Sequence, residues 1–175
     1  MEKSCAATIL SMMKDNSNLA SDQRFVDEFN QFEFDERRRL ADGSFQLASA
    51  QRKAVLMALS HRFSLITGGA GVGKTIALRA LVTLLENDGK TVYQLALSAR
   101  AASQMAESSG RPAMTIAAYL HRRNNSAADQ NLVLIIGEAS MVDVLTFYQI
   151  THGLPPGASL VLMGDPHQLP PIGQA

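Results

Sequence analysis

One glycine-rich stretch has the residue types and the spacing to bind a polyphosphate. It runs from Gly68 to Thr75 and follows the pattern G-x-x-x-x-G-K-T. Glycines allow the backbone to approach a phosphate closely, and the backbone N–H groups then point at the anion. Lys74 can reach the outer phosphates as a point charge, and the Thr75 hydroxyl can bind Mg²⁺. We therefore predict a phosphate-binding P-loop that includes Gly68, Gly71, Gly73, Lys74 and Thr75, with Thr75 as the metal contact.

The residues around this loop predict the elements that position it. An apolar run at 63–66 predicts a strand before the loop, and apolar residues at helical spacing over 78–85 predict a helix after it. A chance glycine turn is the alternative, and it leaves this strand–loop–helix context unexplained. Further strands are expected at 91–97, 132–136 and 159–163, and helices at 49–59 (capped by Ser49), 99–107, 115–122 and 140–150. Strands that alternate with helices predict a three-layer α/β fold with a parallel sheet.

Composition sets the broad class of the protein. The 175 residues are 46% hydrophobic and 18% charged with zero net charge, which is typical of a globular domain and gives no bulk electrostatic case for nucleic acid. One cysteine excludes an internal disulfide, and no long apolar run or export pattern is evident, so we expect a cytoplasmic location. We divide the chain into a helical appendage at 1–42 and a nucleotide-binding core at 43–175. The charges at 35–39 are interpreted as a solvated helix face rather than a nucleic-acid patch.

Two further stretches are expected at the carboxyl edge of the sheet, beside the P-loop. Residues 132–140 have the shape of a Walker B motif, in which a buried strand delivers acidic residues to the site. Residues 161–171 form a strand followed by a polar loop. The amide of Gln168 in that loop can hydrogen-bond the γ-phosphate or the attacking water.

Taken in order, residues 47 to 175 resemble the first motor domain of superfamily 1 DNA helicases, in the branch of RecD and the conjugative relaxase-helicases TraA and TraI. Gln51 matches a glutamine that precedes the first strand in that family. Residues 96–102 resemble its A-P-T-[GK]-x-A-A motif, and Thr115, Ile116 and His121 resemble its T-V-H-R-L-L stretch. Residues 164–171 match G-D-x-x-Q-L-P-P. The resemblance implies a RecA-like P-loop NTPase domain.

The resemblance also implies ligands and roles. ATP and Mg²⁺ would be the cofactors, with Gln51 on the adenine base. Glu138 would be the general base for water, acting with Lys74 and Gln168. Single-stranded DNA would be a partner, together with the remaining domains of a larger helicase chain. The expected DNA-contacting residues share one side of the carboxyl edge, away from the nucleotide, and are Ser98, Arg100, Thr115, His121, Arg122 and Arg123.

Two departures from the family pattern bear on activity. Gly137 stands where the D-E-A-S-M motif has its Asp, which normally positions Mg²⁺, and Leu97-Ser98-Ala99 replaces Pro-Thr-Gly. Asp143 and Asp165 are further acidic residues nearby in the sequence. The favoured hypothesis is a single-stranded DNA-binding module with impaired ATP hydrolysis. The alternative is a functional motor domain of an ATP-dependent DNA helicase, whereas a P-loop kinase or GTPase would leave Gln51 and the Gln168 loop unexplained.

Overall fold

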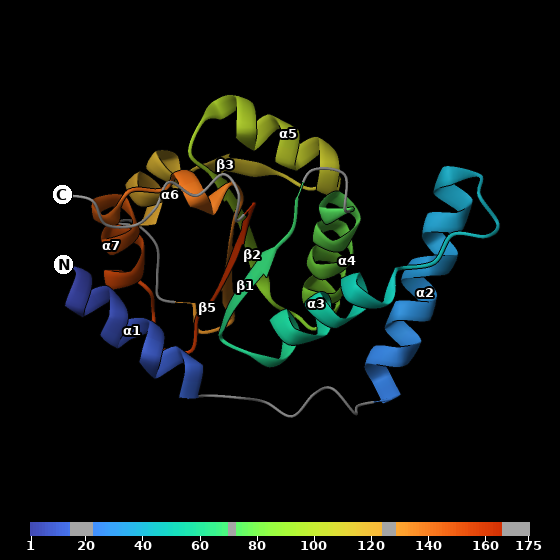
Figure 1. The fold of residues 1–175 in the computed structure, drawn as a ribbon, viewed down its shortest axis with the longest axis horizontal. Coiled ribbons are helices and arrows are strands. Elements are labelled where there is room, and N and C mark those ends of the chain that lie inside the picture. Colours follow the sequence, from blue (N-terminus) through green and yellow to red (C-terminus); the bar gives the residue numbers. More distant parts are fainter. Residues whose placement is uncertain (15–22, 70–72, 124–128, 166–175) are drawn as a thin grey trace.

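The computed structural model describes residues 1–14, 23–69, 73–123 and 129–165, and its centre is a parallel sheet (Figure 1). The five strands lie in the order β1-β5-β4-β2-β3, and every neighbouring pair is parallel. All five carboxyl ends therefore meet at one edge. The strands are β1 (Phe63–Thr67), β2 (Thr91–Ala96), β3 (Ala113–Thr115), β4 (Leu132–Ile136) and β5 (Ser159–Gly164).

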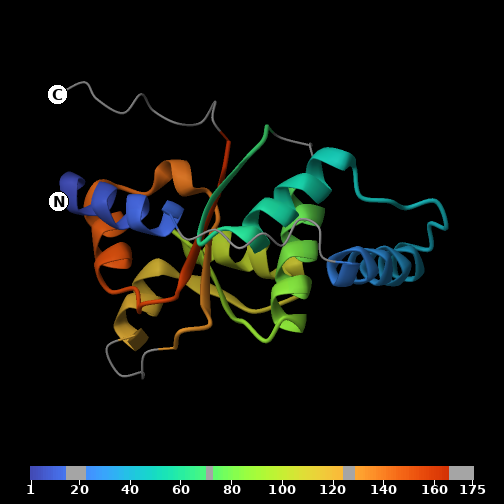
Figure 2. The same cartoon turned by 90° about the horizontal axis from the view of Figure 1, so that it is seen from below.

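Helices cover both faces of this sheet, which confirms the predicted three-layer α/β fold (Figures 1 and 2). One face is covered by α3 (Ser49–Ser60), α4 (Lys74–Asn87) and α5 (Ala99–Ser109). The other face is covered by α1 (Glu2–Lys14), α6 (Ile116–Arg123) and α7 (Val144–His152). A short 3-10 turn, η2 (Ala139–Met141), follows β4, and α2 (Gln23–Leu40) packs outside α4. None of the described helices is long and apolar enough to cross a membrane.

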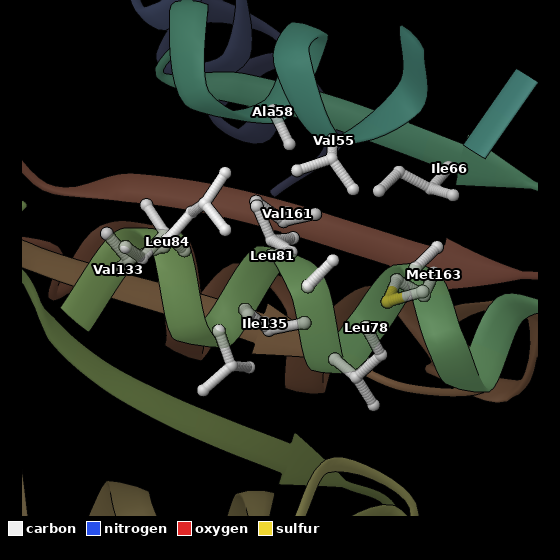
Figure 3. Close-up of a cluster of buried hydrophobic side chains, with 14 of the residues drawn as sticks. Val55, Ala58, Ile66, Leu78, Leu81, Leu84, Val133, Ile135, Val161 and Met163 are labelled. Atoms are coloured by element: carbon white, nitrogen blue, oxygen red, sulfur yellow. The ribbon is translucent and has the colours of Figure 1, made fainter. Parts of the chain in front are cut away.

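The side chains of β4 are buried on both faces of the sheet. Val133 and Ile135 belong to the core beneath α3 and α4, whereas Leu132, Leu134 and Ile136 belong to the core beneath α6 and α7. Figure 3 shows the first core, in which leucines of α4 point toward β4 and β5. Side chains of a strand alternate between faces, so an unbroken apolar run is what a central strand needs when both faces are covered.

The two N-terminal helices lie on opposite sides of the molecule (Figures 1 and 2). In α1, Cys5 and Met12 are buried, and the Thr151 hydroxyl of α7 donates to the Cys5 thiol at 3.8 Å. In α2, the buried residues include Phe25 and Phe29, which join the core with α3 and α4. Both helices therefore bury side chains against the α/β core, and the division at residues 42 and 43 stays a prediction.

The charges at 35–39 match the predicted solvated face only in part: Asp35, Arg38 and Arg39 are exposed, whereas Glu36 is buried. Glu36 is only 5% exposed, accepts from the Arg39 guanidinium at 2.6 Å, and lies 3.8 Å from Arg79 Nε on α4. Glu33 is 4% exposed and accepts from Arg52 on α3 at 2.7 Å. A buried carboxylate needs such partners, since desolvation without them is costly. The ion pairs of Glu33 with Arg52 and of Glu36 with Arg79 thus hold α2 against α3 and α4.

Three local predictions were inexact. The three-residue β3 was missed, because so short a strand shows no alternation. Ser49 is the first residue of α3 rather than its cap: the cap is Ala48, whose N–H donates to the Gln51 side chain at 2.9 Å. The helix predicted at 140–150 is divided, because Asp143 caps α7 by accepting from the Thr146 N–H at 2.9 Å.

Candidate nucleotide site and DNA-facing edge

The P-loop lies between β1 and α4, as the sequence predicts. The Gly68 N–H donates to the Gly164 carbonyl at 3.2 Å, which joins the start of the loop to β5. Gly73 caps α4 with φ +78°, a left-handed conformation that L side chains rarely adopt, and a Cβ there would overlap Gln51 Nε2. A glycine is therefore required at position 73. Gly71 lies outside the described residues.

Lys74 and Thr75 open α4 and face the carboxyl edge. The Lys74 ammonium donates to the Gly68 carbonyl, so the P-loop itself holds this cation in place. Thr75 is exposed at the start of α4, where the backbone N–H groups and the helix dipole favour an anion. Both positions fit the predicted phosphate and metal contacts, which stay predictions.

Lys74 and Thr75 form one wall of a cavity that we call the Glu138 pocket. It encloses about 280 Å³ and lies where β2, β4 and β5 end. Its lining residues are Lys74, Thr75, Leu78, Ala96, Ala101, Gln104, Met105, Ser108, Gly137, Glu138, Met163, Gly164 and Asp165. The P-loop cation, a hydroxyl and two carboxylates thus share one cavity, as phosphate and metal binding requires.

Glu138 occupies this pocket in a strained backbone conformation. Its φ of 52° and ψ of 39° are left-handed, and among non-glycine residues of the described chain only Ala41 shares a positive φ. Such a conformation costs on the order of 1 kcal/mol and is concentrated at functional sites. The turn places an exposed carboxylate directly after β4, where a general base for water would be needed.

Gly137 leaves the position of the missing carboxylate without a side chain. Its N–H donates to the Leu95 carbonyl of β2 at 2.9 Å. A Cβ added at Gly137 would lie 3.2 Å from Met105 Sδ, so a methionine of α5 lies against this position. That α5 lines the pocket could not be predicted from the sequence, because this contact depends on how α5 packs over β2 and β4.

The donor set of the Glu138 pocket is suited to Mg²⁺. It offers the Thr75 hydroxyl with the Glu138 and Asp165 carboxylates, all hard oxygen donors. The described residues contain no group of three or more His, Cys, Asp or Glu side chains that could hold a metal by themselves. Mg²⁺ is usually bound by one or two carboxylates together with substrate phosphates, so this set fits a metal that arrives with a nucleotide.

A second cavity, the Gln51 pocket, lies on the other side of Lys74. It encloses about 220 Å³ and is lined mainly by apolar side chains of α3, β1 and α4. Gln51 Nε2 donates to the Gly73 carbonyl at 3.3 Å, and its Oε1 accepts from the Ala48 N–H. Gln51 thus joins the start of α3 to the P-loop. Its predicted contact with adenine stays a prediction.

Three of the expected DNA-contacting residues lie at the carboxyl edge. Ser98 caps α5 by accepting from the Ala101 N–H at 3.1 Å, and Arg100 is exposed in the first turn of that helix. Thr115 ends β3 and accepts from the Ala118 N–H at 3.1 Å. Ala96 and Thr115 are paired in register, so the two segments leave the sheet side by side.

The other three lie elsewhere. From Thr115, α6 runs back toward the amino edge, carrying His121, Arg122 and Arg123 with it (Figure 2). Arg123 Nη1 donates to the Gln149 carbonyl at 2.8 Å and to the Ile150 carbonyl at 3.4 Å, at the end of α7. The expectation that all six residues share the carboxyl edge therefore does not hold. Gln168 and the rest of its loop lie outside the described residues.

Comparison with known proteins places this geometry in a family. Residues 46–175 match the family described as an AAA domain. The ATP-dependent RecD2 DNA helicase of Deinococcus radiodurans is 34% identical over 131 residues, which is 71% of this chain and 18% of that protein. The multifunctional conjugation protein TraI of Escherichia coli K12 is 34% identical over 142 residues, covering 73% of this chain and 8% of TraI. The chain thus spans less than a fifth of these relatives.

The fold has a counterpart among solved structures. The UvsW helicase from bacteriophage T4 superposes with a TM-score of 0.53 and 14% identity, covering 69% of this chain and 53% of UvsW. At that identity the likeness concerns the fold alone. The chain therefore belongs to the AAA-domain family and, within it, resembles the RecD- and TraI-type domains of superfamily 1 helicases.

Proposed function

We propose that this chain is a nucleotide-binding domain of a larger DNA helicase that binds Mg·ATP, hydrolyses it poorly and contacts single-stranded DNA at its carboxyl edge. The observation that carries the proposal is the Glu138 pocket. It combines the P-loop residues Lys74 and Thr75 with Glu138, yet has Gly137 and Met105 where a metal-positioning carboxylate is expected. Binding groups are retained, while one group needed for turnover is absent.

The chemistry of each group follows from its type. The Lys74 ammonium can balance the charge of the outer phosphates, and the Thr75 hydroxyl can contact Mg²⁺. Glu138 can accept the proton of an attacking water. The metal would neutralise developing charge on the phosphates. Slow turnover is expected because Gly137 offers no carboxylate and because arginines from a second domain, worth roughly 10³- to 10⁵-fold in rate, belong to other parts of such proteins.

The proposed DNA surface is small. It consists of the segment from Ser98 to Arg100 and of Thr115, which leave neighbouring strands at the carboxyl edge. The chain has no net charge and no Trp, so contacts with a few phosphates should dominate over base stacking. Binding should then be weak, salt-dependent and indifferent to sequence. The partner domains and a cytoplasmic location stay predictions.

A second candidate is a fully active motor domain, and one observation favours it. The left-handed backbone that presents Glu138 is costly, and it is retained although Gly137 is not an acidic residue. The two candidates differ in turnover, because both bind nucleotide. A kinase or GTPase is not favoured, since the relatives are helicases.

The DNA surface is tested by titrating fluorescein-labelled oligonucleotides of two sequences at several salt concentrations. With about three phosphate contacts, the log–log salt slope should be near −2, taking about −0.7 per phosphate on a single strand. Arg100→Ala should weaken both sequences equally and make the slope shallower by roughly 0.7. Arg123→Ala is the matched control, because that guanidinium is bound to α7 carbonyls and should leave the slope unchanged. Equal binding by parent and Arg100→Ala at low salt would remove the DNA surface from the proposal.

A further inference from the structure

We propose that Asp165 positions the Mg²⁺ of the bound nucleotide, in place of the carboxylate that is missing at Gly137. The inference rests on the proposed nucleotide binding and adds a residue to it. It concerns which carboxylate faces the metal, and it requires no turnover.

The topology of the sheet brings Asp165 to the metal side of the site. Strand β5 lies between β1, which leads into the P-loop, and β4, which leads to Glu138. The last pair of β1 and β5 is Thr67 with Gly164, and the next N–H, that of Gly68, also bonds to Gly164. Asp165 therefore leaves the sheet between the start of the P-loop and the turn that presents Glu138.

On its other side, the end of β5 contacts the turn that follows β4. A Cβ added at Gly164 would lie 3.6 Å from the Ser140 nitrogen and 3.8 Å from the Ala139 nitrogen, so the end of β5 packs against η2. Asp165 is half-buried and lines the same pocket as Thr75 and Gly137. Its carboxylate thus shares a cavity with the hydroxyl that is expected to contact the metal.

The other acidic side chains near the site are placed differently or have a different proposed role. Asp143 accepts from the N–H and the hydroxyl of Thr146 at the start of α7, at 2.9 and 2.7 Å, and does not line the pocket. Glu138 directly follows Gly137 and is the proposed base for water. Among the described residues that line the Glu138 pocket, Asp165 is the carboxylate other than Glu138. One carboxylate, one hydroxyl and two phosphates form a set that Mg²⁺ commonly accepts.

The test uses Mn²⁺ as a spectroscopic substitute for Mg²⁺ and a non-hydrolysable ATP analogue, so that no turnover is needed. Electron paramagnetic resonance measures the affinity of Mn²⁺ for the complex of the 175-residue chain with the analogue. Asp165→Asn should weaken Mn²⁺ binding about tenfold, the scale of effect seen when a carboxylate that supports a metal site is lost. The affinity for the analogue in EDTA should be unchanged or tighter, because only the metal has lost a partner.

Asp143→Asn is the matched control. It removes the same charge near the same edge and keeps a good helix cap, so Mn²⁺ affinity should stay within twofold of the parent. Adding Gly137→Asp to Asp165→Asn should restore most of the lost affinity, which a misfolded variant could not do. Asp165→Asn with parental Mn²⁺ affinity would overturn the inference and leave nucleotide binding intact. A parent chain that binds no analogue at all would overturn both proposals.

Discussion

Replacement of Gly137 by aspartate should strengthen Mg²⁺-dependent nucleotide binding without creating an active ATPase. The added carboxylate would extend from the end of β4, at a position that lines the same pocket as Thr75 and Asp165. The N–H of residue 137 would keep its bond to the Leu95 carbonyl, since a side chain does not alter it. Because a nearby carboxylate favours the metal but cannot supply the arginines of a second domain, binding should respond and turnover should not.

The structure sets the size of the steric cost. The new Cβ would lie 3.2 Å from Met105 Sδ and 3.6 Å from Met105 Cε, so the thioether has to shift by a few tenths of an ångström. Methionine is flexible, and overpacking of this kind costs on the order of 1 kcal/mol. The backbone of Gly137 does not have a positive φ. Replacing this glycine therefore stabilises the fold by about 0.4–1 kcal/mol, because the unfolded chain loses conformational freedom. The net change in the free energy of unfolding should be within about 1 kcal/mol of zero.

Gly137→Ala separates the two effects, because it adds the Cβ without the carboxylate. Isothermal titration of a non-hydrolysable ATP analogue should give about tenfold tighter binding for Gly137→Asp than for Gly137→Ala in Mg²⁺. In EDTA the aspartate variant should bind no better than the alanine variant. Equal affinities of the two variants in Mg²⁺ would refute the idea that a carboxylate at position 137 supports the metal. Rapid ATP turnover by Gly137→Asp would refute the idea that turnover needs arginines from a second domain.

Three further predictions concern the elements around the site. Arg123→Ala should lower the free energy of unfolding by about 1 kcal/mol in urea, because two carbonyls at the end of α7 lose their donor, and an unchanged midpoint would contradict that role. Glu33→Ala should cost about 2–3 kcal/mol, since it leaves the Leu47 N–H and a partly buried guanidinium without their acceptor. The exposed Asp35→Ala is its control and should stay within about 0.5 kcal/mol; equal midpoints for the two variants would argue against α2 being held by Glu33. Hydrogen bonds from the first turn of α7 lower the pKa of Asp143, so its stabilising effect is present above the ordinary aspartate pKa and is lost as pH falls through the folded value. The gap in Tm between parent and Asp143→Ala should therefore close in acid, and a constant gap would refute this linkage.

The fold and the P-loop could be predicted because their signals are local. A strand, a glycine loop with Lys74 and a helix follow one another directly, and the apolar run of β4 identifies a strand covered on both faces. The direction of α6 could not be predicted in this way, because helix packing carries Arg123 to the end of α7. The burial of Glu36 depends on Arg79, a residue of a different helix. Both the direction of α6 and the burial of Glu36 depend on contacts between segments that are far apart in the sequence.

The position of Met105 against Gly137 shows the same limit at the site itself. The sequence identifies Gly137 as a departure from the family motif, but the contact depends on the pairing of β2 with β4 and on α5 above them. Asp165 was visible in the sequence only as a nearby carboxylate. Its place between the P-loop and Glu138 follows from the strand order, in which β5 separates β1 from β4.

The central proposal is that this domain binds Mg·ATP and hydrolyses it poorly, and the nucleotide recovered from the protein tests that proposal directly. The 175-residue chain, in excess over radiolabelled ATP and Mg²⁺, is separated from free nucleotide after a fixed time, and the bound label is identified by chromatography. We predict that label is bound and is recovered as ATP, because Lys74 and Thr75 are in place while Gly137 offers no carboxylate. Recovery of the bound label as ADP, or the absence of bound label, would contradict the account.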